Sequence, residues 1–286
     1  MNINLKYENP DGPKLNIHEK DGVVFLSNPL LDQFDWVVNG ISTRIGGVSE
    51  GEVSTLNLSM YIDEAPEKTT ENYRRLMTAM GLDYKKTVSG RQSHEDHVVV
   101  IDENHVFPEV PGIQADYDNT DGFVTNLPGA VLTVRTADCV PISIVDPVHK
   151  AVGVCHSGWK GTVKKISQAT LRKMKEAYGT DPADVYVGIG PSICMDCFEV
   201  QWDLIEAFKA AFDEETLKTL YYQKDEIKYR FDLWQANKLI LLEAGVKEDH
   251  IAQANLCTMN NADVLYSYRA LRPACPSMAT VISIVE

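Results

Sequence analysis

The sequence predicts an α/β protein in which mixed β-sheets are covered by helices. Runs dominated by β-branched residues alternate along the 286-residue chain with stretches whose apolar residues recur at helical spacing. One turn, Asp146-Pro147, joins two apolar runs with too few residues for a crossover helix, so these two strands are expected to form an antiparallel hairpin. A hairpin within an alternating pattern indicates mixed sheets rather than a purely doubly wound fold.

Nine short runs are expected to be strands because β-branched residues dominate them. In chain order they cover residues 23–27, 36–43, 97–102, 130–136, 141–146, 151–157, 185–190, 264–269 and 278–284. The stretch 108–122 carries prolines and glycines and is expected to be a long loop, of the kind that is often functional.

Three stretches have the apolar spacing of amphipathic helices, and each is followed by a glycine that favours a helix end. They cover residues 66–80, 162–178 and 232–244, and the last begins with Asp232 as the expected N-cap. No linker or repeat divides the sequence. Residues 1–286 are therefore expected to form a single domain, with a less regular N-terminal segment at 1–35.

Composition excludes several classes of function. The formal net charge of −14 disfavours nucleic acid as a partner, because phosphate backbones require an excess of Lys and Arg. Runs of about 18 apolar residues are absent, so no membrane span is expected. The polar N-terminus has no signal-peptide pattern, and six cysteines in so long a chain do not indicate a disulfide framework. A cytoplasmic protein with reduced thiols is the expectation.

Cys139 and His156 stand at the open end of the expected hairpin. Cys139 lies seven residues before Asp146, and His156 lies nine residues after Pro147. At about 3.3 Å per residue, this offset leaves the two side chains about 7 Å apart along the strands, close enough to converge. A buried core cysteine beside a surface histidine is the alternative interpretation of this pair.

A third candidate ligand comes from the stretch Gly90–Val98. Two imidazoles and a thiolate can bind zinc or copper, and ligands that are scattered in sequence are typical of a catalytic site rather than a zinc finger. His94 and His97 are three residues apart, so on an extended strand at most one of them points into such a site.

Several motifs in one order resemble the YlmD/YfiH family, also described as multicopper polyphenol oxidases or laccase-domain proteins. The resemblance runs from about Ile41 to the C-terminus, and its segments are GISTRIGGVSEG, RQSH, TADCVP, CHSGWKG, IGPSICMDCFEV, FDLWQANKLIL and a late SYR. It implies an αββα sandwich of mixed sheets, shared distantly with the deamidase domain of cytotoxic necrotizing factor toxins.

The resemblance also implies a site and an activity. His94, Cys139 and His156 match the family's metal ligands, with zinc as the expected ion and copper as the alternative. The implied substrates are a purine nucleoside and phosphate: adenosine, inosine and methylthioadenosine are phosphorolysed, and adenosine is also deaminated. The older oxidase label implies several copper ions, but the chain has only seven histidines and no His-x-His pair.

Five residues are candidates for catalysis. Cys139 and His156 have just been described, and Asp138 is either a general acid or base, an aid to a metal ligand, or a carboxylate that stabilises a turn. Arg44 and Lys160 either bind phosphate or are ordinary surface cations; the glycines after Arg44 would allow close approach to a ligand. Cys194 and Cys197 form a C-x-x-C pattern without a second pair, which favours a structural role.

Three other functions remain open. Cys139 with His156 as its base would suit a hydrolase or amidase, for example one acting on a peptidoglycan precursor. A copper-dependent oxidase of phenols and a non-enzymatic metal-binding module are further alternatives. A monomer and a homodimer are both compatible with the sequence.

Overall fold

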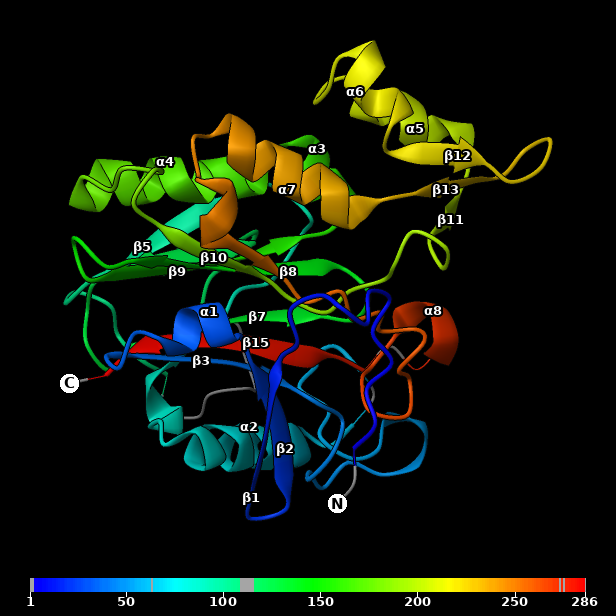
Figure 1. Cartoon of the computed structure of the whole chain (residues 1–286). Coiled ribbons are helices and arrows are strands. Elements are labelled where there is room, and N and C mark those ends of the chain that lie inside the picture. Colours follow the sequence, from blue (N-terminus) through cyan, green and yellow to red (C-terminus); the bar gives the residue numbers. More distant parts are fainter. Residues whose placement is uncertain (1–2, 63, 109–115, 273, 275, 286) are drawn as a thin grey trace.

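Two stacked β-sheets with helices on their outer faces form the centre of the molecule (Figure 1). The computed structural model describes residues 3–62, 64–108, 116–272, 274 and 276–285. The layers follow one another as helix, sheet, sheet and helix (Figure 1). This arrangement confirms the predicted α/β class with mixed sheets.

The first sheet has six strands, and only the pair β4·β7 is parallel. C-terminal strand β15 lies at its centre between β3 and β7, so the end of the chain is built into the core. In sheet order the strands are β1 (Asn16–Lys20), β2 (Val23–Ser27), β3 (Val37–Ser42), β15 (Met278–Ile284), β7 (Val131–Thr136) and β4 (Thr87–Val88).

The second sheet also has six strands and carries the predicted hairpin. Its central strands pair antiparallel, and its two edge pairs are parallel. In sheet order the strands are β14 (Ile251–Gln253), β10 (Tyr186–Ile189), β8 (Val140–Asp146), β9 (Ala151–Ser157), β6 (Gly122–Thr125) and β5 (Val98–Ile101). Every residue of β8 and β9 is buried, because one face meets the first sheet and the other meets helices.

Helices cover the outer face of each sheet. α2 (Pro66–Met80) packs on β2 and β3, whereas α4 (Ile166–Tyr178) packs on β9, β5 and β6, with α7 (Leu233–Glu243) beside it. Asp232 caps α7 as expected, since its side chain accepts a hydrogen bond from the Gln235 N–H. The helix predicted at 162–178 is divided into α3 (Trp159–Val163) and α4, because Lys165 adopts a left-handed conformation with φ of 56°.

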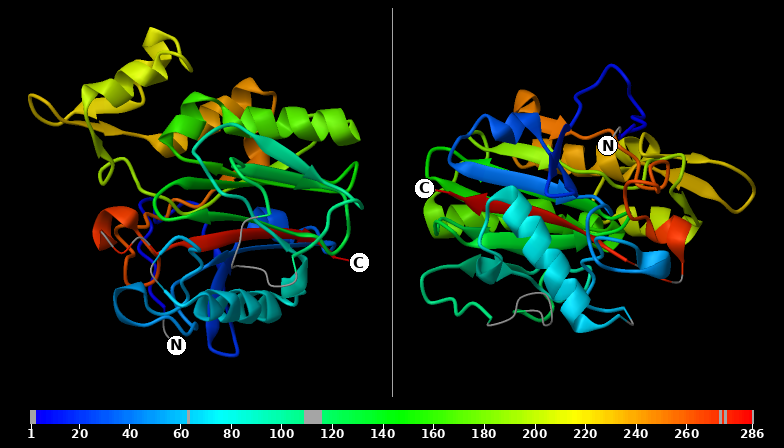
Figure 2. Two further views of the ribbon diagram at one scale, coloured as in Figure 1. Left: turned by 180° about the vertical axis from the view of Figure 1, so that it is seen from behind. Right: turned by 90° about the horizontal axis from the view of Figure 1, so that it is seen from below.

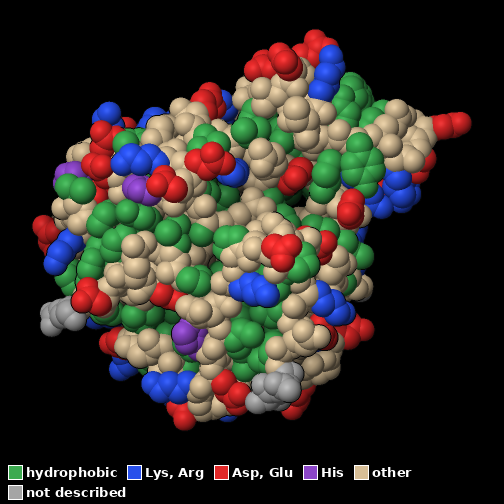
Figure 3. All heavy atoms as spheres, viewed as in Figure 1, with side chains coloured by type: hydrophobic (Ala, Val, Ile, Leu, Met, Phe, Trp, Pro, Cys, Tyr) green, Lys and Arg blue, Asp and Glu red, His purple; other side chains and the backbone are tan. Residues whose placement is uncertain are grey.

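A small lobe projects from one side of the sandwich (Figure 2). It contains a three-stranded sheet and two short helices, β11 (Glu199–Val200), α5 (Trp202–Phe208), α6 (Glu214–Lys218), β12 (Tyr221–Gln223) and β13 (Tyr229–Phe231). The remaining short helices are α1 (Pro29–Asp32) and α8 (Tyr268–Leu271), with single 3-10 turns at Gly51–Val53, Tyr84–Lys86 and Glu248–His250. Acidic and basic side chains intermingle on the face shown in Figure 3.

One expectation about local structure is wrong. The strand predicted at 264–269 is instead a turn followed by α8, because the N–H groups of Val264 and Leu265 both donate to the Asn261 carbonyl. Its apolar residues are buried, but they pack without joining a strand ladder. The segment 1–35, expected to be less regular, contains β1, β2 and α1.

Two expectations concern residues that the structure does not describe. Residues 109–115 of the loop predicted at 108–122 lie outside the described residues, as does Cys275, whereas Gly122 already begins β6. No helix in the described ranges is long and apolar enough to cross a membrane.

Candidate metal centre

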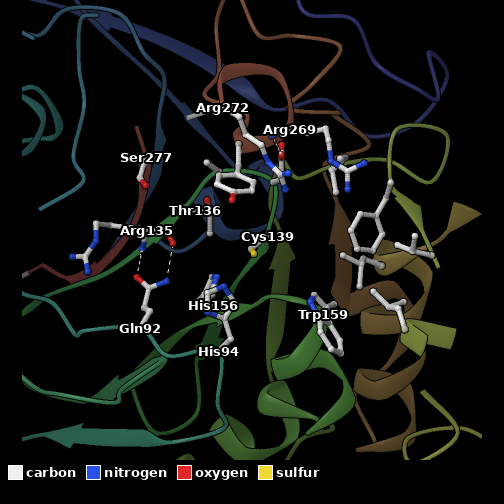
Figure 4. Close-up of a pocket in the computed structure, with 18 of the residues that line it drawn as sticks. Gln92, His94, Arg135, Thr136, Cys139, His156, Trp159, Arg269, Arg272 and Ser277 are labelled. Atoms are coloured by element: carbon white, nitrogen blue, oxygen red, sulfur yellow. Dashed lines mark hydrogen bonds between the residues drawn. The ribbon is translucent and has the colours of Figure 1, made fainter. Parts of the chain in front are cut away.

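The β8–β9 hairpin brings Cys139 and His156 together. Pro141 pairs with His156 across the two strands. Cys139 directly precedes the first residue of β8 and therefore lies beside the histidine. A ligand atom from each, together with one from His94, lies within 4.8 Å of the others. Figure 4 shows the three side chains converging at the floor of a pocket.

His94 reaches this site from the loop between β4 and β5. Its backbone is left-handed, with φ of 64°, and its ring meets the His156 ring edge-on at a centroid distance of 4.8 Å. The neighbouring His97 is held elsewhere, because its Nδ1 lies 3.0 Å from the Asn119 carbonyl oxygen. The structure therefore brings His94, and not His97, to Cys139 and His156.

A buried carboxylate, Asp121, holds both histidines in place. Its Oδ1 accepts a hydrogen bond of 2.8 Å from His156 Nδ1 and one of 3.0 Å from the His94 N–H. Its Oδ2 accepts from the N–H groups of Ser93 and Glu95 at 2.9 and 3.2 Å. Because Nδ1 of His156 carries the donated proton, Nε2 is the ring nitrogen left to bind a metal ion.

The sequence reasoning missed Asp121. It stands at the end of the stretch interpreted as a loop, immediately before β6, and β6 pairs with the strand that carries His156. An acidic residue directly before a strand was the available signal, because metal-binding histidines usually donate their second N–H to a carboxylate or carbonyl. That signal becomes specific only once the pairing of β6 with β9 is known.

Gly158 leaves room for all three candidate ligands. A Cβ at this position would lie 2.8 Å from His94 Cδ2, closer than real Cβ atoms come to other atoms, and 3.0 Å from Cys139 Sγ, which is a tight contact. The His156 ring is also near, at 3.5 Å. The glycine of the CHSGWKG segment is therefore required by close approach.

The charges of the centre favour a thiolate. Burial raises the pKa of Cys139, but the charge and hydrogen bond of His156, together with those of His94, outweigh it and lower the pKa to about 6. Burial lowers the pKa of His156, whereas Cys139 and Asp121 raise it to about 9. Two imidazoles and a thiolate that ionises readily are a donor set suited to zinc or copper.

The centre opens into a cavity of about 900 Å³ between the sandwich and the small lobe. Trp159, Phe198 and Tyr268 contribute aromatic surface to its walls. This volume lies in the range of about 300–1,000 Å³ that small-molecule sites occupy.

Three arginines line the cavity without a carboxylate partner among the described residues. Arg135 Nη2 donates to the Gly90 carbonyl, and Arg269 Nη2 donates to the Glu199 carbonyl. Arg272 lies over the Tyr268 ring at 4.3 Å from its centroid. Lys228 is different, since it pairs with Glu199 at 2.8 Å. A strongly acidic protein thus concentrates unpaired guanidinium groups at one cavity, which suits an anionic ligand.

Arg44, a sequence candidate for phosphate binding, lies outside the lining of the cavity. Its Nε and Nη2 donate to the Ser54 carbonyl at 3.0 and 2.9 Å, and its Nη1 donates to the Ala262 carbonyl at 2.7 Å. The guanidinium also lies over the Tyr266 ring, and Arg44 does not line the cavity. Its donors are used to join two loops.

Lys160, the other sequence candidate for phosphate binding, also lies outside the cavity lining. It is exposed on α3, with its Nζ 5.6 Å from the centroid of the Trp159 ring, and it does not line the cavity. β9 ends at Ser157, and α3 begins at Trp159, whose side chain faces the cavity (Figure 4).

Asp138 lies in the cavity wall, but both its oxygens are engaged. Its Oδ1 accepts from the Thr258 hydroxyl at 2.6 Å, and its Oδ2 accepts from the Arg269 N–H at 2.7 Å. The residue has a left-handed backbone, with φ of 82°, directly before Cys139. Of the roles proposed for it, the contacts favour a carboxylate that fixes the turn carrying the thiol.

Comparisons with known proteins place the chain in a family. Residues 38–285 match the family model described as multi-copper polyphenol oxidoreductase laccase. The chain belongs to this family. Two purine nucleoside phosphorylases are similar over most of their length. The protein from Bacteroides thetaiotaomicron is 34% identical over 84% of this chain and 89% of its own, and YlmD from Bacillus subtilis is 30% identical over 87% and 89%.

Other relatives extend the comparison. Adenosine deaminase RL5, from an unknown prokaryotic organism, is 34% identical over 82% of this chain and 89% of its own. The crystal structure of YlmD from Geobacillus stearothermophilus superposes with a TM-score of 0.87 at 27% identity, over 96% of this chain and 100% of that one. Bacillus licheniformis YfiH gives a TM-score of 0.85 at 25% identity, over 94% and 98%.

Replacing Asp121 with asparagine is expected to weaken metal binding about 10- to 100-fold. The amide cannot accept the same set of hydrogen bonds, so both histidines lose their orientation. Competition with a chromophoric chelator measures the affinity. Asp146→Asn is the matched control, because Asp146 is another buried carboxylate, bonded to His149 at the opposite end of the hairpin. Equal losses in both variants would assign Asp121 a general structural role.

Alkylation of Cys139 in metal-free protein is expected to rise with pH through a midpoint near 6. Only the thiolate reacts, and the flanking imidazoles stabilise it below the pH at which ordinary thiols ionise. Cys155 provides the internal control, since burial raises its pKa to about 12. Mass spectrometry after brief iodoacetamide treatment gives the profile for each cysteine. A Cys139 midpoint at the ordinary thiol value of 9.0 contradicts the expected ion pair.

Proposed function

We propose that the protein is a metal-containing purine nucleoside phosphorylase that acts on adenosine, inosine and methylthioadenosine and also deaminates adenosine. The observation that carries the proposal is one cavity with two kinds of chemistry. Unpaired guanidinium groups for an anion line the same space as His94, Cys139 and His156. The names of the relatives, purine nucleoside phosphorylases and one adenosine deaminase, support both activities.

In phosphorolysis a phosphate oxygen bonds to the anomeric carbon of the nucleoside while the glycosidic bond breaks toward the purine. The site must therefore hold an anion beside a sugar that becomes cationic, and stabilise a leaving base that gains electron density. Arg135, Arg269 and Arg272 are the groups available to hold phosphate. The aromatic walls at Trp159, Phe198 and Tyr268 suit the flat base.

His94, Cys139 and His156 would hold the metal ion, which we propose to be zinc, with copper as the alternative. When bound, such an ion supplies a Lewis acid and lowers the pKa of water. The chain's own contribution is orientation, because Asp121 fixes the His156 ring and the His94 loop. Deamination of adenosine needs water at the purine C6 carbon in place of phosphate at the sugar.

A hydrolase or amidase is a second candidate, and one contact favours it. Asp121, His156 and Cys139 stand in the order of an orienting carboxylate, a base and a nucleophile. With pKa values of about 6 for Cys139 and about 9 for His156, the thiolate would attack the carbonyl carbon, and His156 would give its proton to the amine that leaves as the amide bond breaks. This reaction uses no phosphate and leaves the three arginines without a role.

The proposal includes a cytoplasmic location and a single functional domain that acts as a monomer or homodimer. A net charge of −14 supports the exclusion of nucleic acid as a partner. The copper-oxidase alternative has less support, because only two histidines reach the centre and the described residues hold no other cluster that includes histidine.

Purified protein is expected to convert inosine to hypoxanthine only when phosphate is supplied. Phosphate is the second substrate, so the rate should saturate with its concentration and ribose 1-phosphate should appear in equal amount. Chromatography of both products measures this. Release of hypoxanthine without phosphate would indicate a nucleoside hydrolase. Cleavage of amides with no turnover of nucleosides would favour the Cys139 amidase.

Arg272→Ala is expected to raise the KM for phosphate roughly 10- to 150-fold, the equivalent of about 1.5–3 kcal/mol for a charge-assisted hydrogen bond. Adenosine deamination and metal content should change less, because neither uses phosphate. Lys160→Ala is the matched control, since it removes a cation outside the cavity. Equal losses in phosphorolysis and deamination by Arg272→Ala would place the arginine at the shared nucleoside instead.

A further inference from the structure

A second group of soft ligands lies behind the cavity wall. The sulfur atoms of Cys194, Cys197 and Cys257 are all within 4.8 Å of one another. The first two belong to the C-x-x-C pattern. The third comes from a segment distant in sequence, which is held beside the pattern by a β-bridge between Ser192 and Cys257. All three are free thiols, and Cys194 and Cys257 are buried.

The spacing of these sulfurs suits a tetrahedral metal ion. A tetrahedral zinc ion with Zn–S distances of about 2.3 Å places its sulfurs roughly 3.8 Å apart. The three sulfur atoms would therefore have to move only slightly closer together to bind it. The C-x-x-C segment already forms a turn, in which the Cys197 N–H donates to the Cys194 carbonyl at 3.1 Å. The Cys194 N–H donates to Cys257 Sγ at 3.3 Å, a contact that favours the thiolate form of that sulfur.

Oxygen donors stand beside the sulfurs. Asn260 Oδ1 lies 3.3 Å from Cys197 Sγ, and the Asn260 Nδ2 group donates to Glu8 Oε1 at 2.7 Å. A carboxylate or water oxygen can fill the fourth position of a zinc ion that is held by three protein ligands. The neighbouring carboxylate of Glu8 also adds negative charge that favours a cation.

We propose that Cys194, Cys197 and Cys257 form a zinc site distinct from the His94–Cys139–His156 centre. Binding a divalent ion converts the thiols into thiolate ligands, and their protons pass to the solvent. The sequence alone argued against this site because no second cysteine pair is present. The fold supplies the third sulfur singly, from 60 residues further along the chain than Cys197.

An ion at this position would brace the cavity wall. Ile193 and Phe198, which flank the C-x-x-C segment, line the cavity. Thr258 follows Cys257 and donates its hydroxyl hydrogen to Asp138, the residue before Cys139. The proposed site therefore ties together two segments that shape the wall, and it does so independently of the reaction that the cavity supports.

Zinc stoichiometry of the full-length, metal-free protein tests the proposal. Wild-type protein is expected to bind two equivalents of tightly held zinc, whereas Cys139→Ser and Cys194→Ser should each bind one. Cys155→Ala is the matched control for a buried cysteine outside both groups and should bind two. Two equivalents in Cys194→Ser, or none in Cys139→Ser, would overturn the second site.

Cobalt substitution identifies the ligands separately. Cobalt-loaded Cys139→Ser should keep a strong sulfur-to-metal charge-transfer band, and Cys257→Ser should lose most of it. If Cys257→Ser fails to fold, the half-buried Cys197 provides the alternative variant, Cys197→Ser. A disulfide between any two of the three cysteines in reducing buffer, detected by mass spectrometry after alkylation, would overturn the proposal.

Discussion

The carboxylate of Asp121 is the constraint on which the candidate site depends. A buried charge of this kind costs several kcal/mol unless it is paired and hydrogen-bonded. Burial raises the pKa of Asp121, but hydrogen bonds from His156 and from backbone N–H groups outweigh it and lower the pKa. The chain satisfies this carboxylate with groups from two separate segments, the Ser93–Glu95 turn and β9. Both candidate histidine ligands are consequently held by one residue.

The two-sheet core makes that arrangement rigid. β8 and β9 are buried on both faces, so the hairpin cannot shift its register without exposing an entire set of apolar side chains. β6 lies beside β9, and this pairing delivers Asp121 to His156. His94 and Asp138 have left-handed backbone conformations. They bend the chain in the loop that carries His94 and in the turn directly before Cys139. Such conformations persist because the packed sheets hold the neighbouring backbone in place.

The sequence predicts those parts of the site that follow from a local hairpin. Cys139 and His156 could be paired because a short turn fixes which strand ends meet, and the strands around them were correctly located. His94 was chosen through the family resemblance. Asp121, Arg269 and Arg272 were missed because their place depends on contacts between distant segments. The contacts of Arg44 were unpredictable for the same reason, since the nearby glycines do not show that backbone carbonyls accept hydrogen bonds from its guanidinium.

The chain combines a negative overall charge with positive side chains at the cavity. A net charge of −14 repels anions at long range, yet an anionic substrate needs local cations. Arginines held by carbonyls and aromatic rings, rather than by carboxylates, keep their charge available to a ligand. One carboxylate of the cavity lining, Glu199, pairs instead with Lys224, Lys228 and Arg230. The three guanidinium groups in the cavity lining thus remain available to a ligand, because neutral groups position them.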